Sequence, residues 1–337
     1  MIYNLESCVW EITLGCCFSC KYCGSKGGKA REGELTTEEC IRVAKELYGL
    51  GCKRVSLIGG EVFMRPDWDI IAGTLTGFGI AVNIITNGFL FSEDIIRKIK
   101  ELQVESVAVS IDGPRSVHDK YRQAGSFDRA VNAIKTLTRA EIPVSVISTL
   151  NKENSLYLEE FYQMLASLGI FAWQLQACSP MGNAASGGID IDISFPEIIK
   201  FVEKHAPDAP FMLGIADNIG YFSFSEGMLR GNLSGKAFFG GCRAGISSIG
   251  IDSAGNVRGC ESMYDEKFNE GNLRSKTIRE IWENPEGFSY NRSFDFTMLS
   301  GKCKDCRYGI YCRGGCRSYN YFTTGELYNS IRCGKEE

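Results

Sequence analysis

The sequence predicts an α/β protein, a partial (β/α)6 barrel followed by a small, loop-rich, cysteine-rich domain. Short β-branched runs recur along the first half of the chain, and amphipathic stretches of helical period separate them. From Cys242 onward cysteine and glycine dominate, and long periodic segments become few. Six strand–helix units are fewer than the eight of a closed barrel, so we expect the sheet to stay open on one side.

Six runs are predicted to be buried strands because β-branched and aromatic residues fill them and turn residues bound them. They are residues 8–14, 54–59, 81–86, 106–112, 143–149 and 171–177. The helical stretches lie between them, at 36–50, 92–102, 126–140 and 155–169. Thr36 or Thr37, followed by Glu38 and Glu39, marks the start of the first helix, where acidic side chains suit the helix dipole. This alternation is typical of right-handed βαβ units in a parallel sheet.

The regular alternation of predicted strands and helices ends after about residue 180. "SPMGNAASGG" (179–188) is a Gly/Ser-rich loop, and the stretch 194–205 is the last clear helix before the tail. This shift places a domain boundary between residues 230 and 240. We therefore expect a barrel domain over residues 1–235 and a cysteine-rich domain over residues 236–337.

Composition narrows the class of protein. The 337 residues are 44% hydrophobic and 23% charged, with a net charge of −4 and no basic run, so a nucleic-acid partner is not expected. The chain shows no signal-peptide pattern and no apolar run near the ~18 residues of a membrane helix, so we expect a cytoplasmic protein without membrane contact. Fifteen cysteines beside two histidines then indicate thiolate-bound zinc or iron–sulfur clusters in preference to disulfides.

The first cysteine group lies in "GCCFSCKYCGS" (15–25) and allows two regular spacings. Cys17, Cys20 and Cys23 make C-x2-C-x2-C, whereas Cys16, Cys20 and Cys23 make C-x3-C-x2-C. The group follows the first predicted strand, and active sites of parallel α/β proteins gather at the carboxyl ends of strands. Three thiolates on one loop suit a [4Fe–4S] cluster with one iron left open, and a three-cysteine zinc site is the alternative.

The spacing C-x3-C-x2-C, with Tyr22 before its last cysteine, resembles the signature of the radical S-adenosylmethionine (SAM) enzymes. Further motifs similar to that family's follow along the chain: "GGE" (59–61), "TNG" (86–88), "SIDGP" (110–114) and "HDKYR" (118–122). The resemblance implies that Cys16, Cys20 and Cys23 hold the SAM-binding [4Fe–4S] cluster and that Cys17 is a bystander. It also implies that SAM is contacted by Tyr22, Gly59, Gly60, Glu61, Asn87, Ser110 and Arg122.

The tail contains a second cysteine pattern, and its simplest interpretation is a zinc site formed by two C-x2-C-like segments. Its spacings together resemble the SPASM domain, a C-terminal extension of certain radical SAM enzymes, and imply two auxiliary iron–sulfur clusters besides the first. Because residues 243–259 contain no cysteine, auxiliary cluster I is expected to have an open or non-cysteine site. Cluster I would use Cys242, Cys260 and Cys316, and cluster II would use Cys303, Cys306, Cys312 and Cys333.

Two further residues are candidate catalysts. Glu261 follows Cys260, at a position where sulfatase-maturing relatives carry an aspartate that deprotonates the substrate; a solvated hairpin glutamate is the alternative. Cys178, a candidate hydrogen-atom donor, lies in "QACSPMGNA", where Asn183 stands in place of the arginine of a family loop that usually reads P-x-G-R-A. The thiols expected to act only as small buried hydrophobic groups are Cys8, Cys40 and Cys52.

The resemblance implies that reductive cleavage of SAM gives a 5′-deoxyadenosyl radical, which abstracts hydrogen from a substrate while the auxiliary clusters accept an electron. SPASM domains are associated with peptides, so we expect a maturase of ribosomally made peptides that forms a crosslink, thioether or epimer, or an enzyme that alters a protein side chain. The alternatives are a sugar or aminoglycoside dehydrogenase or epimerase, a sulfatase-maturase-like oxidase of Cys or Ser, and an electron carrier or zinc-binding scaffold without SAM.

Two kinds of protein partner are expected. Flavodoxin or ferredoxin would supply the electron. Because the first cluster cysteine is already residue 16, we expect either a separate leader-binding protein or a substrate recognised through a short motif.

Overall fold

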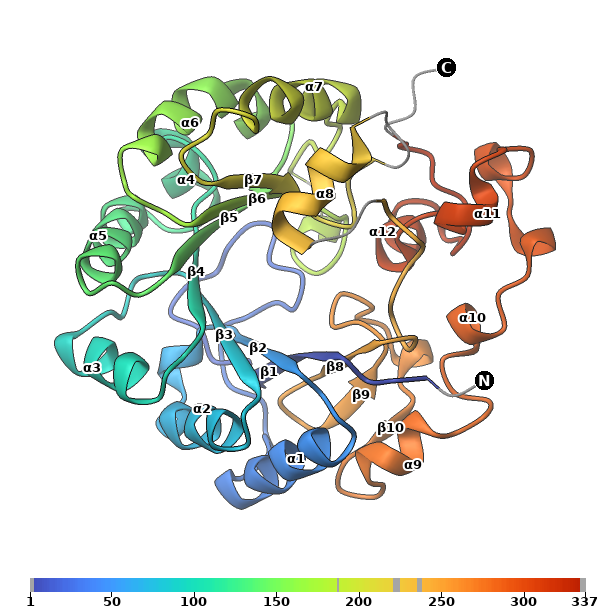
Figure 1. Ribbon diagram of the computed structural model, residues 1–337, viewed down its shortest axis with the longest axis horizontal. Helices are drawn as coiled ribbons and strands as arrows, with labels where there is room; N and C mark the ends of the chain where they lie inside the picture. The colour runs from blue at the N-terminus through green and yellow to red at the C-terminus, as the bar shows by residue number, and fades with distance from the viewer. Residues whose placement is uncertain (1–2, 187, 221–224, 235–237, 334–337) are drawn as a thin grey trace.

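One sheet organises the computed structural model, which describes residues 3–186, 188–220, 225–234 and 238–333. Its strand order is β10-β9-β8-β1-β2-β3-β4-β5-β6-β7, and the pairs from β8 through β1 to β7 are parallel. These strands curve around the middle of the molecule (Figure 1). They are β1 (Ser7–Thr13), β2 (Arg54–Gly59), β3 (Ala81–Thr86), β4 (Ser106–Ser110), β5 (Val144–Leu150), β6 (Ala172–Ala177), β7 (Met212–Ile215), β8 (Ser248–Ile251), β9 (Asn256–Arg258) and β10 (Gly271–Asn272).

Helices cover the outside of the curved sheet, as Figure 1 shows. The predicted start of the first one is confirmed: the Thr36 hydroxyl accepts a hydrogen bond from the Glu39 N–H at 3.2 Å, and the Glu39 carboxylate accepts one from the Thr36 N–H at 2.8 Å. The helices of this part are α1 (Thr37–Gly49), α2 (Trp68–Gly77), α3 (Glu93–Glu101), α4 (Arg115–Tyr121), α5 (Ser126–Arg139), α6 (Leu158–Ala166), α7 (Phe195–His205) and α8 (Glu226–Ser234).

The six predicted strands are all present, each ending within two residues of its predicted bounds. A further parallel strand, β7, pairs with β6 and continues the sheet beyond the six predicted strands. It was not predicted. Its sequence "MLGI" is four residues long and contains Gly214, so it shows no alternation that would mark a strand. Helix α8 follows it and was also missed.

The C-terminal region extends the same sheet. Strand β8 lies parallel to β1 from Ser7 opposite Ser248 to Trp10 opposite Ile251, so β1 has parallel neighbours on both sides. The predicted boundary at residue 235 falls within 235–237, outside the described residues. The region's helices, which Figure 1 places beside the open side of the curved sheet, are α9 (Ile278–Trp282), α10 (Ser289–Arg292), α11 (Gly309–Cys312) and α12 (Arg317–Thr324).

The core lies between the parallel strands and the helices that pack outside them. Trp10 and Ile12 of β1 are fully buried, as are Leu57 of β2 and Val82 of β3. Buried and half-buried residues alternate along β3 and β5, because one face packs on the helices while the other, which includes Val9 of β1, borders a cavity. Among the described residues, no helix is both long and apolar enough to cross a membrane.

Candidate active site

A cavity of about 420 Å³ opens where the loops after the parallel strands meet the C-terminal region. The predicted SAM contact Glu61 and the predicted catalyst Cys178 are not part of its wall, and neither are the predicted bystander Cys17 and the six C-terminal cysteines other than Cys260. The predicted ligands, SAM contacts and catalysts that line it are Cys16, Cys20, Tyr22, Cys23, Gly59, Gly60, Asn87, Ser110, Arg122, Cys260 and Glu261. The structure therefore brings together residues that come from both ends of the chain.

The three cysteines predicted for the first cluster sit on one loop, residues 15–28. A backbone hydrogen bond of 2.7 Å from the Cys16 N–H to the far end of the loop closes it. Inside the loop, the Phe18 N–H donates to the Cys16 Sγ at 3.4 Å and the Gly27 N–H donates to the Cys23 Sγ at 3.2 Å. Backbone N–H groups aimed at sulfur favour the thiolate form, which is the form that binds a metal.

Cys17 differs from the other three cysteines of the loop because it is exposed and does not line the cavity. Its hydrogen bond with Cys16 raises the pKa of Cys16 and lowers the pKa of Cys17 to about 6. Among the described residues, no three Cys, His, Asp or Glu side chains are arranged closely enough to hold a metal ion. What the structure offers is three cavity-lining thiols on one loop, a donor set whose number and softness fit an iron–sulfur cluster.

Gly60 packs the end of β2 directly against the cysteine loop. A Cβ atom at this position would come within 3.0 Å of the Leu14 and Gly15 carbonyl oxygens and of the Cys16 Cβ. Gly59 is similarly restricted, because a Cβ there would lie 2.6 Å from a carbonyl oxygen of β1. The glycine pair of "GGE" is therefore required for close packing of two loops at the cavity.

Glu61 ties the ends of β2 and β3 together beneath the cavity. It is 1% exposed, and its carboxylate accepts hydrogen bonds from the Thr86 hydroxyl at 2.8 Å, the Asn87 N–H at 2.8 Å and the Phe63 N–H at 3.3 Å. Burial raises the pKa of Glu61 to about 7, although these hydrogen bonds oppose the rise. The side chain therefore fixes Asn87, which does line the cavity, and does not itself face it.

Asp112 is a buried acid that sequence reasoning missed, although it lies inside the "SIDGP" motif. Its carboxylate accepts hydrogen bonds from Arg122, from the Tyr22 hydroxyl and, at 2.8 Å, from the Thr149 N–H. Burial acts to raise the pKa of Asp112, but the adjacent Arg122 guanidinium outweighs it and holds the pKa below the usual range. The acid thereby fixes two cavity-lining side chains, Tyr22 and Arg122.

Glu261 faces the same cavity from the segment after β9. It is 8% exposed, so it is not the solvated glutamate of the alternative interpretation. Neither carboxylate oxygen has a hydrogen-bond partner among the described residues, and Arg258 Nη1 lies 4.0 Å away while its Nη2 pairs with Asp252 at 3.1 Å. Burial, reinforced by the charge of Glu11, raises the pKa of Glu261 well above its usual value.

Three of the C-terminal cysteines lie close enough beside the cavity for their charges to affect one another. Burial raises the pKa of Cys260 to about 12, with a further contribution from Cys242. Burial followed by the charges of Cys242 and Cys260 likewise raises the pKa of Cys316. These are the three residues that the resemblance assigns to auxiliary cluster I, and Cys260 is the one that reaches the cavity wall.

The other four C-terminal cysteines form a second such group. Burial raises the pKa of Cys312 to about 12, and the charges of Cys303, Cys333 and Cys306 add to the rise. The Cys303 Sγ also accepts a hydrogen bond of 3.3 Å from the Ser330 N–H, near the end of the described chain. Metal ions would offset the mutual repulsion of such thiolates, so the grouping fits the four-cysteine set predicted for auxiliary cluster II.

Cys178 is 1% exposed and packs with Tyr22, Val117, Tyr121 and Ala184 behind the cavity wall. Burial raises the pKa of Cys178 to about 12. Cys178 therefore lies next to a cavity-lining residue without reaching the cavity itself. The expected burial of three other thiols is confirmed for Cys8, Cys40 and Cys52.

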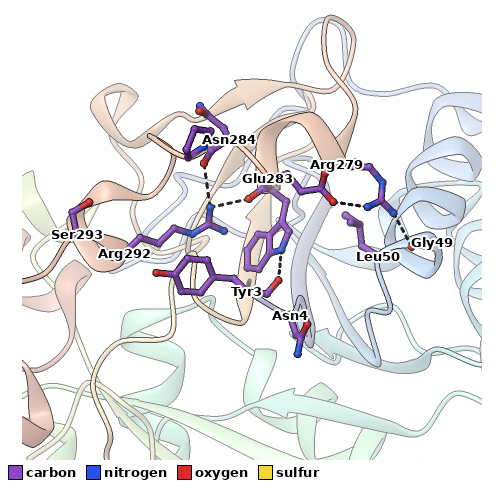
Figure 2. Close-up of a pocket in the computed structure, with 11 residues that line it drawn as sticks. Tyr3, Asn4, Gly49, Leu50, Arg279, Glu283, Asn284, Arg292 and Ser293 are labelled. Carbon is purple, nitrogen blue, oxygen red and sulfur yellow. Dashed lines mark hydrogen bonds and ion pairs between the residues drawn. The ribbon is translucent and has the colours of Figure 1, made fainter. Parts of the chain in front are cut away.

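A larger cavity, of about 740 Å³, lies at the amino-terminal end of the strands (Figure 2). The Arg292 guanidinium lies 4.5 Å from the Tyr3 ring and donates to the Trp282 carbonyl at 2.8 Å, and Arg279 pairs with Glu283 at 2.5 Å. Arg292 thus links the end of α9 to the start of the chain, and no cysteine lines this cavity. The grouped thiols place the chemistry in the smaller cavity.

Comparison with known proteins supports this placement. Residues 10–165 match the family model of the radical SAM superfamily, and residues 242–307 match that of SPASM, an iron–sulfur cluster-binding domain. An AdoMet-dependent heme synthase of Methanosarcina barkeri is 30% identical over 94% of this chain and 92% of its own length. The mycofactocin maturase MftC of Mycolicibacterium smegmatis is 28% identical over 93% of this chain and 78% of its own.

Solved structures show the same fold. SuiB of Streptococcus suis, bound to S-adenosylmethionine, superposes with a TM-score of 0.79 at 15% identity, covering 98% of this chain and 78% of SuiB. The parallel α/β core therefore corresponds to the radical SAM domain, and the cysteine-rich C-terminal region corresponds to the SPASM domain. Enzymes with these two domains use SAM and iron–sulfur clusters. The chain belongs to the radical SAM superfamily, as a member with a C-terminal SPASM domain.

Proposed function

We propose that this enzyme abstracts hydrogen from a ribosomally synthesised peptide or a protein side chain, and so forms a crosslink, thioether or epimer. One observation carries the proposal: a single cavity is lined by the three cysteines of the first loop and by Cys260 and Glu261 of the SPASM region. A substrate held there lies between two redox sites. The relatives include a mycofactocin maturase and a sporulation killing factor maturation protein, and one solved structure of SuiB holds a precursor peptide.

Each of the three groups of cysteines is proposed to bind one iron–sulfur cluster. The SAM-binding cluster takes the cavity-lining thiols of Cys16, Cys20 and Cys23, and the two auxiliary clusters take the two C-terminal groups described above. When bound, the reduced first cluster and SAM supply a 5′-deoxyadenosyl radical for hydrogen abstraction. The domain boundary near residue 235 separates the barrel from the region that holds the auxiliary clusters.

The chain's own residues position SAM. Arg122 and Tyr22 are held by the buried Asp112, so the guanidinium presents a fixed cationic surface for the SAM carboxylate. Ser110 and Asn87 line the same wall, and Asn87 is fixed through Glu61. The two glycines at 59–60 let the end of β2 pack against the cysteine loop, and they would contact the methionine end of SAM from there.

Glu261 is the proposed proton acceptor. Its unpartnered carboxylate oxygens line the cavity, so a proton released from the oxidised substrate has an acceptor beside Cys260. Cys178 was the other predicted catalyst, as a hydrogen-atom donor for epimerisation. Its position behind Tyr22 favours a reaction that ends in oxidation, with Glu261 taking the proton, over one that ends in hydrogen return.

The experiment that tests this function is anaerobic co-expression with a short peptide encoded beside the enzyme, in deuterated water, followed by mass measurement of the peptide. A loss of two hydrogens supports an oxidative crosslink or thioether. One deuterium gained without a change in connectivity indicates an epimer and turns attention to Cys178. An unmodified peptide, while the purified enzyme still cleaves SAM, contradicts the peptide proposal. Adding a flavodoxin or ferredoxin, or a separate leader-binding protein, tests the proposed partners.

A second candidate is the oxidation of a small molecule. The observation that favours it is the 30% identity to a heme synthase over 92% of that relative's length, compared with 78% for the mycofactocin maturase. The discriminating test is incubation of the reconstituted enzyme with an iron porphyrin and SAM, followed by absorbance and mass. Sugar or aminoglycoside oxidation and a sulfatase-maturase-like reaction on Cys or Ser share the fold, and the same mass assay with those substrates distinguishes them.

A further inference from the structure

The loop after β6 is hydrogen-bonded to the cysteine loop through a single residue. The Asn183 Nδ2 donates to the carbonyl oxygen of Cys20 at 2.8 Å, and the Asn183 N–H donates to the carbonyl oxygen of Cys23 at 2.9 Å. Asn183 thus binds the main chain of two of the three proposed ligands of the first cluster. It lies outside the cavity wall, so its role differs from that of the residues that would contact SAM.

The approach of the two loops depends on glycine at Gly182. This residue has φ of +57°, and a Cβ atom there would come within 3.0 Å of the Cys23 and Gly24 carbonyl oxygens. On the opposite side, a Cβ at Gly24 would lie 3.0 Å from the Met181 side chain. Gly182 is therefore in close contact with the main chain of the cysteine loop, and Gly24 leaves room for the Met181 side chain.

The contact sets the direction of two peptide groups. Because the carbonyl oxygens of Cys20 and Cys23 accept from Asn183, they point toward the loop after β6, and they also accept turn bonds from the Cys23 N–H at 3.2 Å and the Lys26 N–H at 3.4 Å. On another side of the same loop, the Lys21 N–H donates to the Tyr121 carbonyl at 2.9 Å. With the loop fixed from both sides, the Gly27 N–H is kept on the Cys23 Sγ at 3.2 Å.

We propose that Asn183 is a positioning residue for the first cluster: it holds the Cys20–Cys23 turn in the shape that the cluster and SAM require. The inference rests on the proposed use of Cys16, Cys20 and Cys23 as ligands. Without the side-chain bond, the turn regains conformational freedom and the N–H to sulfur geometry loosens. Hydrogen bonds to cluster sulfurs help set the reduction potential, so a looser turn shifts the midpoint potential to more negative values.

Asn218, which lines the cavity near the end of β6, provides a control. Its side-chain amide accepts from the Ala177 N–H at 3.1 Å and donates to the Ala177 carbonyl at 2.8 Å, so both bonds go to the end of β6 and not to the cysteine loop. Asn218→Ala therefore removes two side-chain bonds, whereas Asn183→Ala removes one and keeps the bond from the Asn183 N–H to Cys23. Asn183→Asp keeps the shape of Asn183 but removes the donor to Cys20, and Gly182→Ala keeps Asn183 but forces the loops apart.

The test is hydrogen–deuterium exchange of the full chain, both anaerobically reconstituted and after iron chelation, with electron paramagnetic resonance of the SAM-sensitive signal. We expect exchange in residues 20–28 of the chelated chain to be about tenfold faster for Asn183→Ala and Asn183→Asp than for the wild type or Asn218→Ala. In the reconstituted chain, the SAM-sensitive cluster of both Asn183 variants should have a lower midpoint potential. Gly182→Ala should reproduce both effects.

Unchanged exchange and an unchanged potential in the Asn183 variants would overturn the proposal. Exchange that rises equally in β5 and β6 would also overturn it, because that result assigns Asn183 to general stability. Formation of 5′-deoxyadenosine by the wild-type enzyme is measured alongside. Its absence would contradict the proposed function, whereas the exchange pattern alone decides the role of Asn183.

Discussion

Arg122 donates hydrogen bonds to both carboxylate oxygens of Asp112, and the two side chains are buried together under the wall of the cysteine-lined cavity. Asp112→Asn leaves the guanidinium without its counter-charge. We expect the free energy of unfolding to fall by about 3–5 kcal/mol. SAM cleavage should fall about 100-fold because Arg122 and Tyr22 lose their fixed positions.

Thermal unfolding and 5′-deoxyadenosine formation measure these two effects. Asp128→Asn is the matched control, since Asp128 and its partner Arg115 are both exposed. Equal behaviour of the two variants would show that the buried pair has no special role.

Gly60→Ala is expected to remove the first cluster and spare the auxiliary ones. The new Cβ would overlap the Gly15 carbonyl and the Cys16 Cβ, so the cysteine loop must move. Iron per chain should fall by about four atoms, with loss of the SAM-sensitive paramagnetic signal. Gly28→Ala is the control on the same loop, because a Cβ there meets nothing within 4 Å. A full iron content in Gly60→Ala would refute the close-packing role of the glycine pair.

His118 gives the fold a defined sensitivity to acid. It is fully buried, and its Nδ1 accepts a hydrogen bond from the Asp112 N–H at 3.3 Å. Burial, with the charge of Arg122, lowers the pKa of His118 to about 4, so the unfolded chain binds a proton more readily than the folded one between about pH 6.5 and 4. Stability contributed by neutral His118 is complete above pH 6.5 and is lost as the pH falls toward 4.

The predicted loss amounts to about 3 kcal/mol at most over that range. The measurement compares the pH dependence of unfolding for wild type and His118→Gln. The slope between pH 6.5 and 4 should be shallower in the variant, and parallel curves would mean that His118 titrates alike in both states.

Glu261→Gln is expected to separate SAM cleavage from product formation. The amide keeps the size of the side chain and cannot accept the substrate proton, so product should form on the order of 100-fold more slowly while cluster content stays constant. Glu266→Gln, an exposed position of the same region, is the control. Full product formation by Glu261→Gln would assign the proton to another acceptor.

The sequence was informative about local features and silent about contacts between distant segments. The parallel strands β1–β6 were predicted because buried strands concentrate β-branched residues, whereas β7 has four residues and one glycine. The pairing of β8 with β1 joins positions about 240 residues apart, and no local pattern records such a pairing. Their parallel arrangement explains why Cys260 and Glu261 reach a cavity formed mainly by the barrel.

The same limit applies inside the site. The cysteine spacing identified the cavity-lining residues 16, 20 and 23 because it is a property of one loop. Asp112 was overlooked within a quoted motif, since its importance comes from Arg122, Tyr22 and Thr149 in space. Glu61 is predicted to contact SAM, and the bonds of its carboxylate to β3 and to the turn after β2 were not predicted, because only coordinates show them.

The central claim is that Cys16, and not Cys17, joins Cys20 and Cys23 in binding the cluster that cleaves SAM. The most direct measurement is 5′-deoxyadenosine formed by reconstituted, dithionite-reduced Cys16→Ala and Cys17→Ala variants beside the wild type. We predict near wild-type formation by Cys17→Ala and none by Cys16→Ala. Activity retained by Cys16→Ala and lost by Cys17→Ala would contradict this account and assign the ligands to the C-x2-C-x2-C spacing.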